Sequence, residues 1–164
     1  MGASGELWIN APSRFTAYLE NPVATERAFD AGGLFRTGDL GRLAERGFIY
    51  EARMGDAMRL GGFLVAPEEI EAVIQALPGV AGVQVVAAAG KGDPAPVAFV
   101  QPVDGMKLDA AAVRAHCREQ LARFKVPERI VLVDKFPVVD SPNGPKVQRV
   151  RLREMAEALL REPF

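Results

Sequence analysis

The stretch AMRLGGFLVAPEEIEAVIQALPG, residues 57–79, contains the two elements that decide the fold. Gly61-Gly62 separates two short apolar runs, and paired glycines supply the positive φ angles that a tight hairpin turn requires. Pro67-Glu68-Glu69 suits a first helical turn, where proline and carboxylates are favoured. Apolar residues then recur at helical spacing up to the break at Pro78-Gly79: Ile70, Val73, Ile74 and Leu77. The stretch therefore predicts a two-stranded hairpin followed by an amphipathic helix.

The residues after this helix complete a small sheet. Apolar runs at 83–88 and 97–100 predict two strands, and Asp109 can cap a second helix that extends to Ala122. A last apolar run at 130–133 closes the sheet. The order hairpin, helix, strand, strand, helix, strand predicts an α+β fold in which both helices pack on one face of a three-stranded sheet.

The residues before the hairpin form a less regular segment. Residues 6–9 are a strand candidate, and Asn21-Pro22 begins a short capped helix. Residues 34–43 and 48–51 predict a β-hairpin. The segment has many glycines and few large apolar residues, so we expect it to bury little core of its own.

These patterns divide the chain into residues 1–52, a junction at 53–56 and residues 57–164. Gly55 gives the junction backbone freedom. The junction is therefore either a hinge or a plain linker between domains.

Composition sets broad bounds on function. Of the 164 residues, 49% are apolar and the net charge is −1, so nothing favours nucleic acid or a membrane surface as partner. The basic C-terminal segment is interrupted by glutamates and predicts a solvated helix face. A single cysteine, Cys117, excludes an internal disulfide and fits a reducing compartment. Without a secretory segment or a run that spans a bilayer, we expect a cytoplasmic protein.

Several kinds of catalytic site find no support in the sequence. One histidine and one cysteine, without paired His/Asp spacing, predict no metal site. His116 and Cys117 are adjacent in a predicted helix and so do not face each other. We therefore expect a buried cysteine beside a rim histidine rather than a nucleophile pair. The chain also lacks a G-x-x-x-x-G-K-[ST] loop and a strand-linked G-x-G-x-x-G, so a phosphate cradle would come from elsewhere.

Three local groups are candidates for a binding or catalytic role. The stretch SPNGPKVQR, residues 141–149, places Lys146 just after a Pro/Gly-rich turn, where its ammonium can stabilise charge on a phosphate or carboxylate. Asp39 follows a glycine in a strand pattern and can accept bonds from a ribose diol. The run 59–63 can let a thin ligand pass close to its glycine backbone. A solvated lysine, a turn aspartate and a plain hairpin are the alternatives.

Taken in order, these groups resemble the adenylate-forming enzymes, a superfamily that includes acyl-CoA synthetases, nonribosomal peptide adenylation domains and luciferases. The resemblance covers nearly the whole chain and rests on residues 5–8, 36–40, 53–56, 62–71, 124–127 and Lys146. Residues 124–127 and 146–149 look most like the acyl-CoA synthetase branch. The resemblance implies that residues 1–52 end a large N-terminal domain and that residues 57–164 are the mobile C-terminal domain.

The resemblance also implies roles for single residues in a two-step reaction. ATP and a carboxylate first give an acyl-adenylate, and CoA then takes the acyl group. Lys146 matches the lysine of the first step, Asp39 would bind the ribose hydroxyls, and Arg53 would reach ribose or phosphate. Gly61-Gly62 would line the pantetheine passage. Arg59 is a candidate for contact with phosphate or CoA, and Gly55 falls at the hinge position.

The sequence departs from the family pattern at three positions. Ala52 replaces a usual glycine, and Gly55 stands where the family commonly has lysine or aspartate. We expect Gly55 to give a softer hinge, and unchanged half-reaction rates in Gly55→Asp and Gly55→Lys would contradict this. Pro145 is an apparent extra residue before Lys146 that can shift the lysine away from the phosphate.

The resemblance begins late in the family pattern, so the phosphate loop, adenine pocket and acyl pocket fall upstream of it. ATP or AMP and CoA are the implied cofactors, and Mg²⁺ is expected with ATP but has no ligand in this chain. The implied partners are the large N-terminal domain and a carboxylic acid substrate. We expect the chain alone to be inactive and its apolar face to favour self-association. The alternative is a stand-alone, non-catalytic module that binds a partner or a CoA-like ligand.

Overall fold

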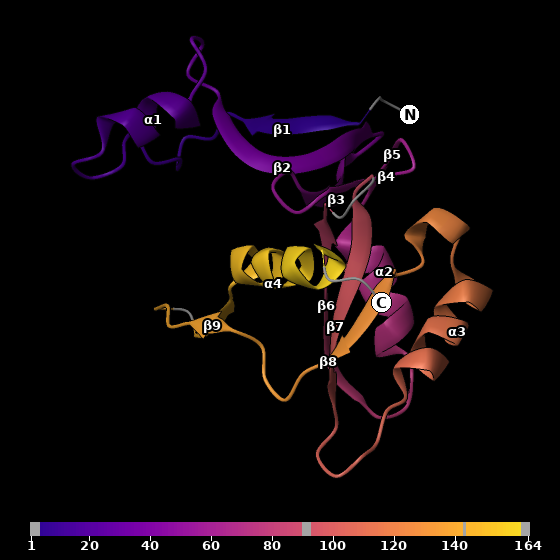
Figure 1. Cartoon of the computed structure of the whole chain (residues 1–164). Helices are drawn as coiled ribbons and strands as arrows, with labels where there is room; N and C mark the ends of the chain where they lie inside the picture. The colour runs from indigo at the N-terminus through magenta and orange to yellow at the C-terminus, as the bar shows by residue number, and fades with distance from the viewer. Residues whose placement is uncertain (1–3, 90–92, 143, 162–164) are drawn as a thin grey trace. The chain divides into compact units, whose positions relative to one another are not determined.

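The computed structural model describes residues 4–89, 93–142 and 144–161. The chain divides into two compact units, with the division between Asp56 and Ala57 (Figure 1). We describe each unit by itself.

The first unit is a three-stranded antiparallel sheet with one short helix. Strands β1 (Gly5–Ile9), β2 (Phe35–Ala44) and β3 (Gly47–Arg53) lie in the order β1-β2-β3. Helix α1 (Pro22–Ala28) begins where Asn21 Oδ1 accepts a hydrogen bond of 3.0 Å from the Ala24 amide. The predicted strand, capped helix and hairpin are confirmed.

The first unit has little interior. Four of its aromatic side chains, Phe15, Tyr18, Phe29 and Phe35, form a cluster in which the contacting rings have centroids 4.8–5.6 Å apart. In the described part of this unit the buried residues are the small Gly41 and Ala52, while large side chains such as Leu43 remain 69% exposed. The scarcity of large apolar residues had predicted such a poor core.

The second unit begins with the predicted hairpin and helix. Strands β4 (Met58–Leu60) and β5 (Phe63–Val65) pair antiparallel. Gly61 and Gly62 turn the chain with φ angles of 55° and 85°, and helix α2 (Pro67–Gln75) follows. All three elements are where the sequence predicted them.

The predicted three-stranded sheet has the order β6-β7-β8 and consists of β6 (Val80–Ala88), β7 (Ala95–Pro102) and β8 (Arg129–Leu132). Strands β6 and β7 are antiparallel, and β7 and β8 are parallel. A parallel pair needs a long crossover, which here contains helix α3 (Ala110–Gln120). Asp109 caps α3 by accepting a hydrogen bond of 3.0 Å from the Ala111 amide.

Both faces of this sheet are covered. Alternate residues of β6 and β7 enter two separate cores. The first core joins the sheet to α2 and α3 through Ile70, Ile74, Val113 and Cys117. The second joins it to α4 (Arg149–Arg161) through Leu152 and Ala156, which are both 0% exposed. Figure 1 shows α4 across the sheet from α2 and α3.

The fold prediction is therefore right for α2 and α3 and incomplete for α4. The basic segment has a solvated face, as predicted, but its opposite face is buried in the second core. Apolar residues recur along it at helical spacing, and they are the signal that reveals this face: Leu152, Met155, Ala156, Leu159 and Leu160.

Two short features had no prediction. Strands β9 (Val138–Val139) and β10 (Lys146–Val147) pair antiparallel, and η1 (Arg123–Lys125) is a 3₁₀ turn. Elements of two or three residues are too short to show a hydrophobic period. Among the described helices, none has the length and apolar character needed to cross a membrane.

Candidate functional site

The first unit brings Asp39 and Arg53 together. They are partners in the ladder between β2 and β3, and Arg53 Nη1 lies 2.6 Å from Asp39 Oδ1. The side chains are 28% exposed for Asp39 and 57% for Arg53, so both stay accessible to a ligand. The sequence proposed the two residues separately, and the hairpin register explains why they meet.

The strand around Asp39 is held by several hydrogen bonds. The Asp39 amide donates to Thr37 Oγ1 at 3.0 Å, and that hydroxyl donates to the Leu7 carbonyl at 2.6 Å. Gly38 has φ 72°, and an added Cβ would lie 3.7 Å from the Arg53 guanidinium. Gly38 thus lets the backbone bend beside the ion pair, where a side chain would be strained.

A groove of about 700 Å³ lies in this unit. Arg53 and residues 35–38 line it together with α1, whereas Asp39 lies outside the lining. A guanidinium suits a phosphate oxygen, and one carboxylate oxygen of Asp39 remains to accept from a hydroxyl. The arrangement fits a phosphorylated sugar.

Lys146 lies in the second unit on β10, and its side chain is exposed. The preceding turn closes where the Gly144 amide donates to the Ser141 carbonyl at 2.9 Å, with Gly144 at φ 96°. Asn143 of this predicted turn lies outside the described residues. Within the described ranges, the Lys146 ammonium has no hydrogen-bond or ion-pair partner, so it is available to an anion.

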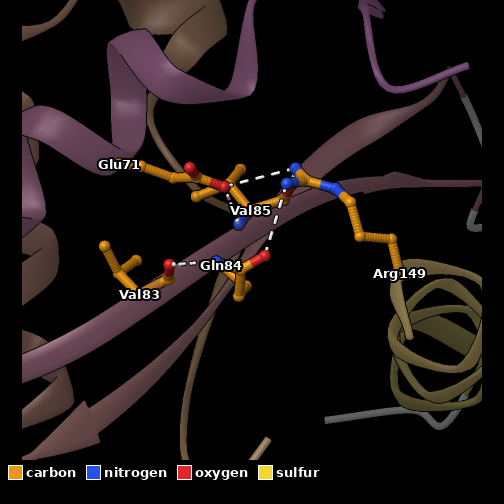
Figure 2. Close-up of polar contacts among 5 residues, drawn as sticks. All are labelled: Glu71, Val83, Gln84, Val85 and Arg149. Atoms are coloured by element: carbon orange, nitrogen blue, oxygen red, sulfur yellow. Dashed lines mark hydrogen bonds and ion pairs between the residues drawn. The ribbon is translucent and has the colours of Figure 1, made fainter. Parts of the chain in front are cut away.

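The residues after Lys146 are anchored to the rest of the unit. Val147 packs against the second core, and the Gln148 amide donates to the Pro137 carbonyl at 2.8 Å. Arg149 Nη2 donates to the Val85 carbonyl at 2.8 Å and lies 3.2 Å from Glu71 Oε1. Figure 2 shows this network, in which Arg149 extends from the start of α4 to the edge strand β6.

Sequence analysis missed this network because it placed Arg149 in a solvated basic segment. Glu71 Oε1 also accepts from the Val85 amide at 2.8 Å, and Arg149 Nη1 donates to Gln84 Oε1 at 3.3 Å. The partners are 64–78 residues apart from Arg149 in sequence. No local pattern connects residues so distant.

Burial raises the pKa of Glu71, although Val85 and Arg149 oppose the shift, and Glu68 adds to it. A carboxyl whose pKa is raised on folding binds its proton more tightly in the folded state. Its contribution to stability is complete below the ordinary glutamate pKa and is lost as the pH rises through the raised pKa. The free-energy cost of burying the ionised Glu71 carboxylate is thus larger than the stabilisation that its partners provide.

We expect the free energy of unfolding of the wild type to fall relative to that of Glu71→Gln as the pH rises from about 4 to about 7. Glutamine has no titrating proton, so the variant lacks this term. Urea unfolding of both proteins across that range measures the difference. A difference that stays flat, or grows with pH in favour of the wild type, would contradict the raised pKa.

The β4–β5 hairpin packs against the η1 segment. The Phe63 and Phe124 rings stack with centroids 5.0 Å apart, and Lys125 forms an ion pair with Glu69 of α2. An added Cβ on Gly61 would lie 3.2 Å from Phe124 Cβ, so a side chain there crowds the contact. Two of the motifs quoted above, 62–71 and 124–127, thus meet in space.

The other predicted residues of this region have fewer contacts. Arg59 is exposed on β4 and has no polar partner among the described residues. Gly62 has open space around an added Cβ, and so does Gly55 of the first unit. Cys117 is fully buried, and burial raises the pKa of its thiol, as a core cysteine requires. His116, which was expected at the rim beside it, is half-buried.

A second groove of about 700 Å³ lies beside the hairpin turn, and sequence analysis missed it. Gly61 lines it together with three arginines, Arg114, Arg118 and Arg123, which outnumber the two acidic residues of the lining, Asp93 and Glu128. Arg114 Nε is buried without a hydrogen-bond partner in the described structure. Such a donor set suits a ligand that carries phosphates. The i, i+4 spacing of the first two arginines on α3 was an available signal.

No group of three or more His, Cys, Asp or Glu side chains that could hold a metal is present in the described ranges. The first unit therefore contributes the Asp39–Arg53 pair as a candidate, and the second unit separately contributes Lys146 on its turn and the hairpin with its arginine groove.

Comparisons with known proteins agree on one family. Residues 69–141 match the AMP-binding enzyme C-terminal domain. The 2-succinylbenzoate–CoA ligase of Geobacillus kaustophilus is 44% identical over 137 residues, which are 82% of this chain and 28% of the relative. A putative acyl–CoA ligase of Bacillus subtilis, YdaB, is 36% identical over 160 residues, 94% of this chain and 30% of that protein.

Solved structures give the same result. ATP-bound MatB from Rhodopseudomonas palustris superposes with a TM-score of 0.84 at 34% identity, over 98% of this chain and 32% of that one. The amide bond synthetase McbA from Marinactinospora thermotolerans gives 0.79 at 30% identity, over 95% and 31%. The chain spans about three tenths of the length of these proteins.

The family match and the fold thus define the class of protein. The chain belongs to the adenylate-forming enzymes and contains their AMP-binding enzyme C-terminal domain. Its homologues within that class are acyl-CoA ligases.

Proposed function

We propose that this chain is the C-terminal part of an ATP-dependent acid–CoA ligase whose large N-terminal domain is its partner. The ligase names of its relatives and the small share of their length that it spans support the proposal. The observation that carries it is Lys146, an exposed ammonium without a described partner, on a short strand whose two sides are anchored.

In the first step a carboxylate oxygen attacks the α-phosphorus of ATP, the bond to the bridging oxygen breaks, and pyrophosphate leaves. Two anions must approach each other, and the Lys146 ammonium offsets their repulsion and stabilises the charge that develops. Asp39 accepts from the ribose hydroxyls through the oxygen that Arg53 leaves free. Arg53 contacts ribose or phosphate, and Mg²⁺ accompanies ATP without a ligand from this chain.

In the second step the CoA thiol attacks the acyl carbon and AMP leaves. Gly61-Gly62 lines the passage of the pantetheine arm because side chains there would narrow it. The arginine groove beside this turn holds the phosphates of CoA, and Arg59 assists at the hairpin. The domains reorient between the steps about residues 53–56, with Gly55 as the hinge.

The test joins this chain to the large domain of a relative. We define the joined enzyme as the Geobacillus kaustophilus ligase in which this chain replaces the corresponding C-terminal part. The joined enzyme should catalyse 2-succinylbenzoate-dependent ATP–pyrophosphate exchange and form the CoA thioester. This chain alone and the truncated relative alone should do neither. Exchange by this chain alone, or a folded joined enzyme without activity, would refute the proposal.

The arginine groove gives a separate prediction. Arg118→Ala combined with Arg123→Ala should raise the KM for CoA in the joined enzyme by about tenfold, because charge-assisted bonds to phosphate are lost. ATP–pyrophosphate exchange should not change, since CoA takes no part in it. Steady-state rates at varied CoA measure the effect, and Arg161→Ala, on the exposed end of α4, is the matched control. An unchanged KM would exclude the groove as the phosphate site.

A further inference from the structure

Lys146 depends on the backbone that carries it. A lysine side chain is long and flexible, so the position of its ammonium is defined only as well as its Cα is held. Strand β10 consists of two residues and pairs with an equally short strand, β9. So small a ladder gives weak support of its own. The support on the C-terminal side of the lysine is therefore important.

Arg149 supplies that support three residues after the lysine. Its guanidinium contacts three groups on two elements: the Val85 carbonyl, the Gln84 side chain and Glu71. Both charged side chains are largely buried, with 20% of Arg149 and 15% of Glu71 exposed. A planar guanidinium with several fixed donors holds one orientation better than an ammonium does. The first residue of α4, two positions after the end of β10, is thus attached to β6 and α2 (Figure 2).

Helix α4 does not need Arg149 for its attachment to the sheet. Leu152 and Ala156 are fully buried against the sheet and hold the body of the helix. The contacts of Arg149 therefore act on the first residue of α4 and on the segment just before it. Loss of the guanidinium frees the lysine segment while the helix remains packed.

The Arg149–Glu71 ion pair also does little to stabilise the fold. Burial raises the pKa of Glu71 even with Arg149 beside it, so the ion pair does not offset the loss of hydration. Buried ion pairs often contribute little net stability, and some of them specify geometry instead. A geometric role agrees with the position of this pair directly behind the lysine.

We propose that Arg149, held by Glu71, Gln84 and Val85, is a positioning residue that fixes the strand carrying Lys146 for the adenylation step. The proposal rests on the proposed function, because it needs Lys146 to act on ATP. Arg149 itself touches neither ATP nor the carboxylate and acts through the lysine. Thioester formation, which does not use the lysine, should be independent of the pair.

The test measures both half-reactions of the joined enzyme. Arg149→Met should lower kcat for ATP–pyrophosphate exchange by about tenfold. Its rate of thioester formation from supplied acyl-adenylate should stay within about twofold of the wild type. Arg149→Lys should recover part of the loss, because the ammonium keeps the positive charge beside Glu71 but lacks the planar fork that contacts all three groups at once. Arg151→Met is the matched control, since Arg151 is 64% exposed and forms a surface ion pair with Glu154.

The decisive experiment combines the substitutions Lys146→Ala and Arg149→Met. In the Lys146→Ala background, Arg149→Met should lower exchange no further, because a positioning residue has nothing left to position. An additional loss in that background, or an equal fall in both half-reactions, would overturn the proposal and leave a purely structural role. If Arg149→Met does not fold, Glu71→Gln tests the positioning role instead, and it should show the same selective loss of exchange.

The two proposals fail separately. If Lys146→Ala leaves exchange intact, the proposed function of the lysine is wrong and the positioning role is wrong with it. If Lys146→Ala abolishes exchange while Arg149→Met does not reduce it, only the positioning role is wrong.

Discussion

Lys146→Ala in the joined enzyme is expected to lower ATP–pyrophosphate exchange by about 10²–10³-fold, the usual effect of removing one preorganised group that stabilises transition-state charge. The ammonium is exposed and has no described partner, so the substitution leaves no buried group unsatisfied. Thioester formation from supplied acyl-adenylate should change less than about twofold. The loss of activity would therefore be confined to the adenylation step and would not reflect a loss of folding.

Exchange of radiolabelled pyrophosphate into ATP and single-turnover thioester formation measure the two steps. Lys135→Ala is the matched control, because Lys135 is also an exposed lysine of the second unit. If both lysine variants exchange pyrophosphate as fast as the wild type, Lys146 is not the adenylation lysine. Pro145, which directly precedes it, would then be the first residue to delete.

Leu152→Ala should reduce the free energy of unfolding of the second unit by about 2–5 kcal/mol. Leu152 is 0% exposed in the core between α4 and the sheet, and truncation there leaves a cavity as well as losing burial. The structure makes α4 an integral layer of the unit rather than a solvated appendage. The size of the loss decides between these two descriptions.

Urea unfolding of the chain, followed by circular dichroism, measures this loss. Val150→Ala on the same helix is the control, because Val150 is 64% exposed and its truncation should cost no more than about 0.5 kcal/mol. Equal effects of the two substitutions would show that α4 does not pack on the sheet in solution.

The sequence predicted those parts of the fold whose signal is local. The double glycine, the proline and acidic first turn of α2 and the Asp109 cap each occupy a few neighbouring residues, and each is confirmed. Apolar residues recur at helical spacing in the sequence of α4, but its many charged residues favoured the interpretation that the helix is solvated. A strand of two residues, such as β10, is too short to show an alternation of apolar and polar residues.

The candidate site divides in the same way. Asp39 and Arg53 could be proposed from their motifs, and their contact follows from the pairing of β2 with β3. The attachment of Arg149 to Glu71 and Val85 joins residues that only the tertiary fold brings together. The roles of Lys146 and the other site residues remain predictions until the half-reactions are measured.

The two-sided sheet also has a consequence for the order of synthesis. Every residue of the first core precedes α4 in the chain, so that core can close while the last helix is still in the ribosome. The segment that carries Lys146 is anchored only after Arg149 contacts strand β6. That strand is synthesised more than sixty residues before Arg149. A polypeptide that ends before α4 would lack Arg149 and the helix that covers the second core, so one face of its sheet would be uncovered and, on the proposal above, Lys146 would not be positioned.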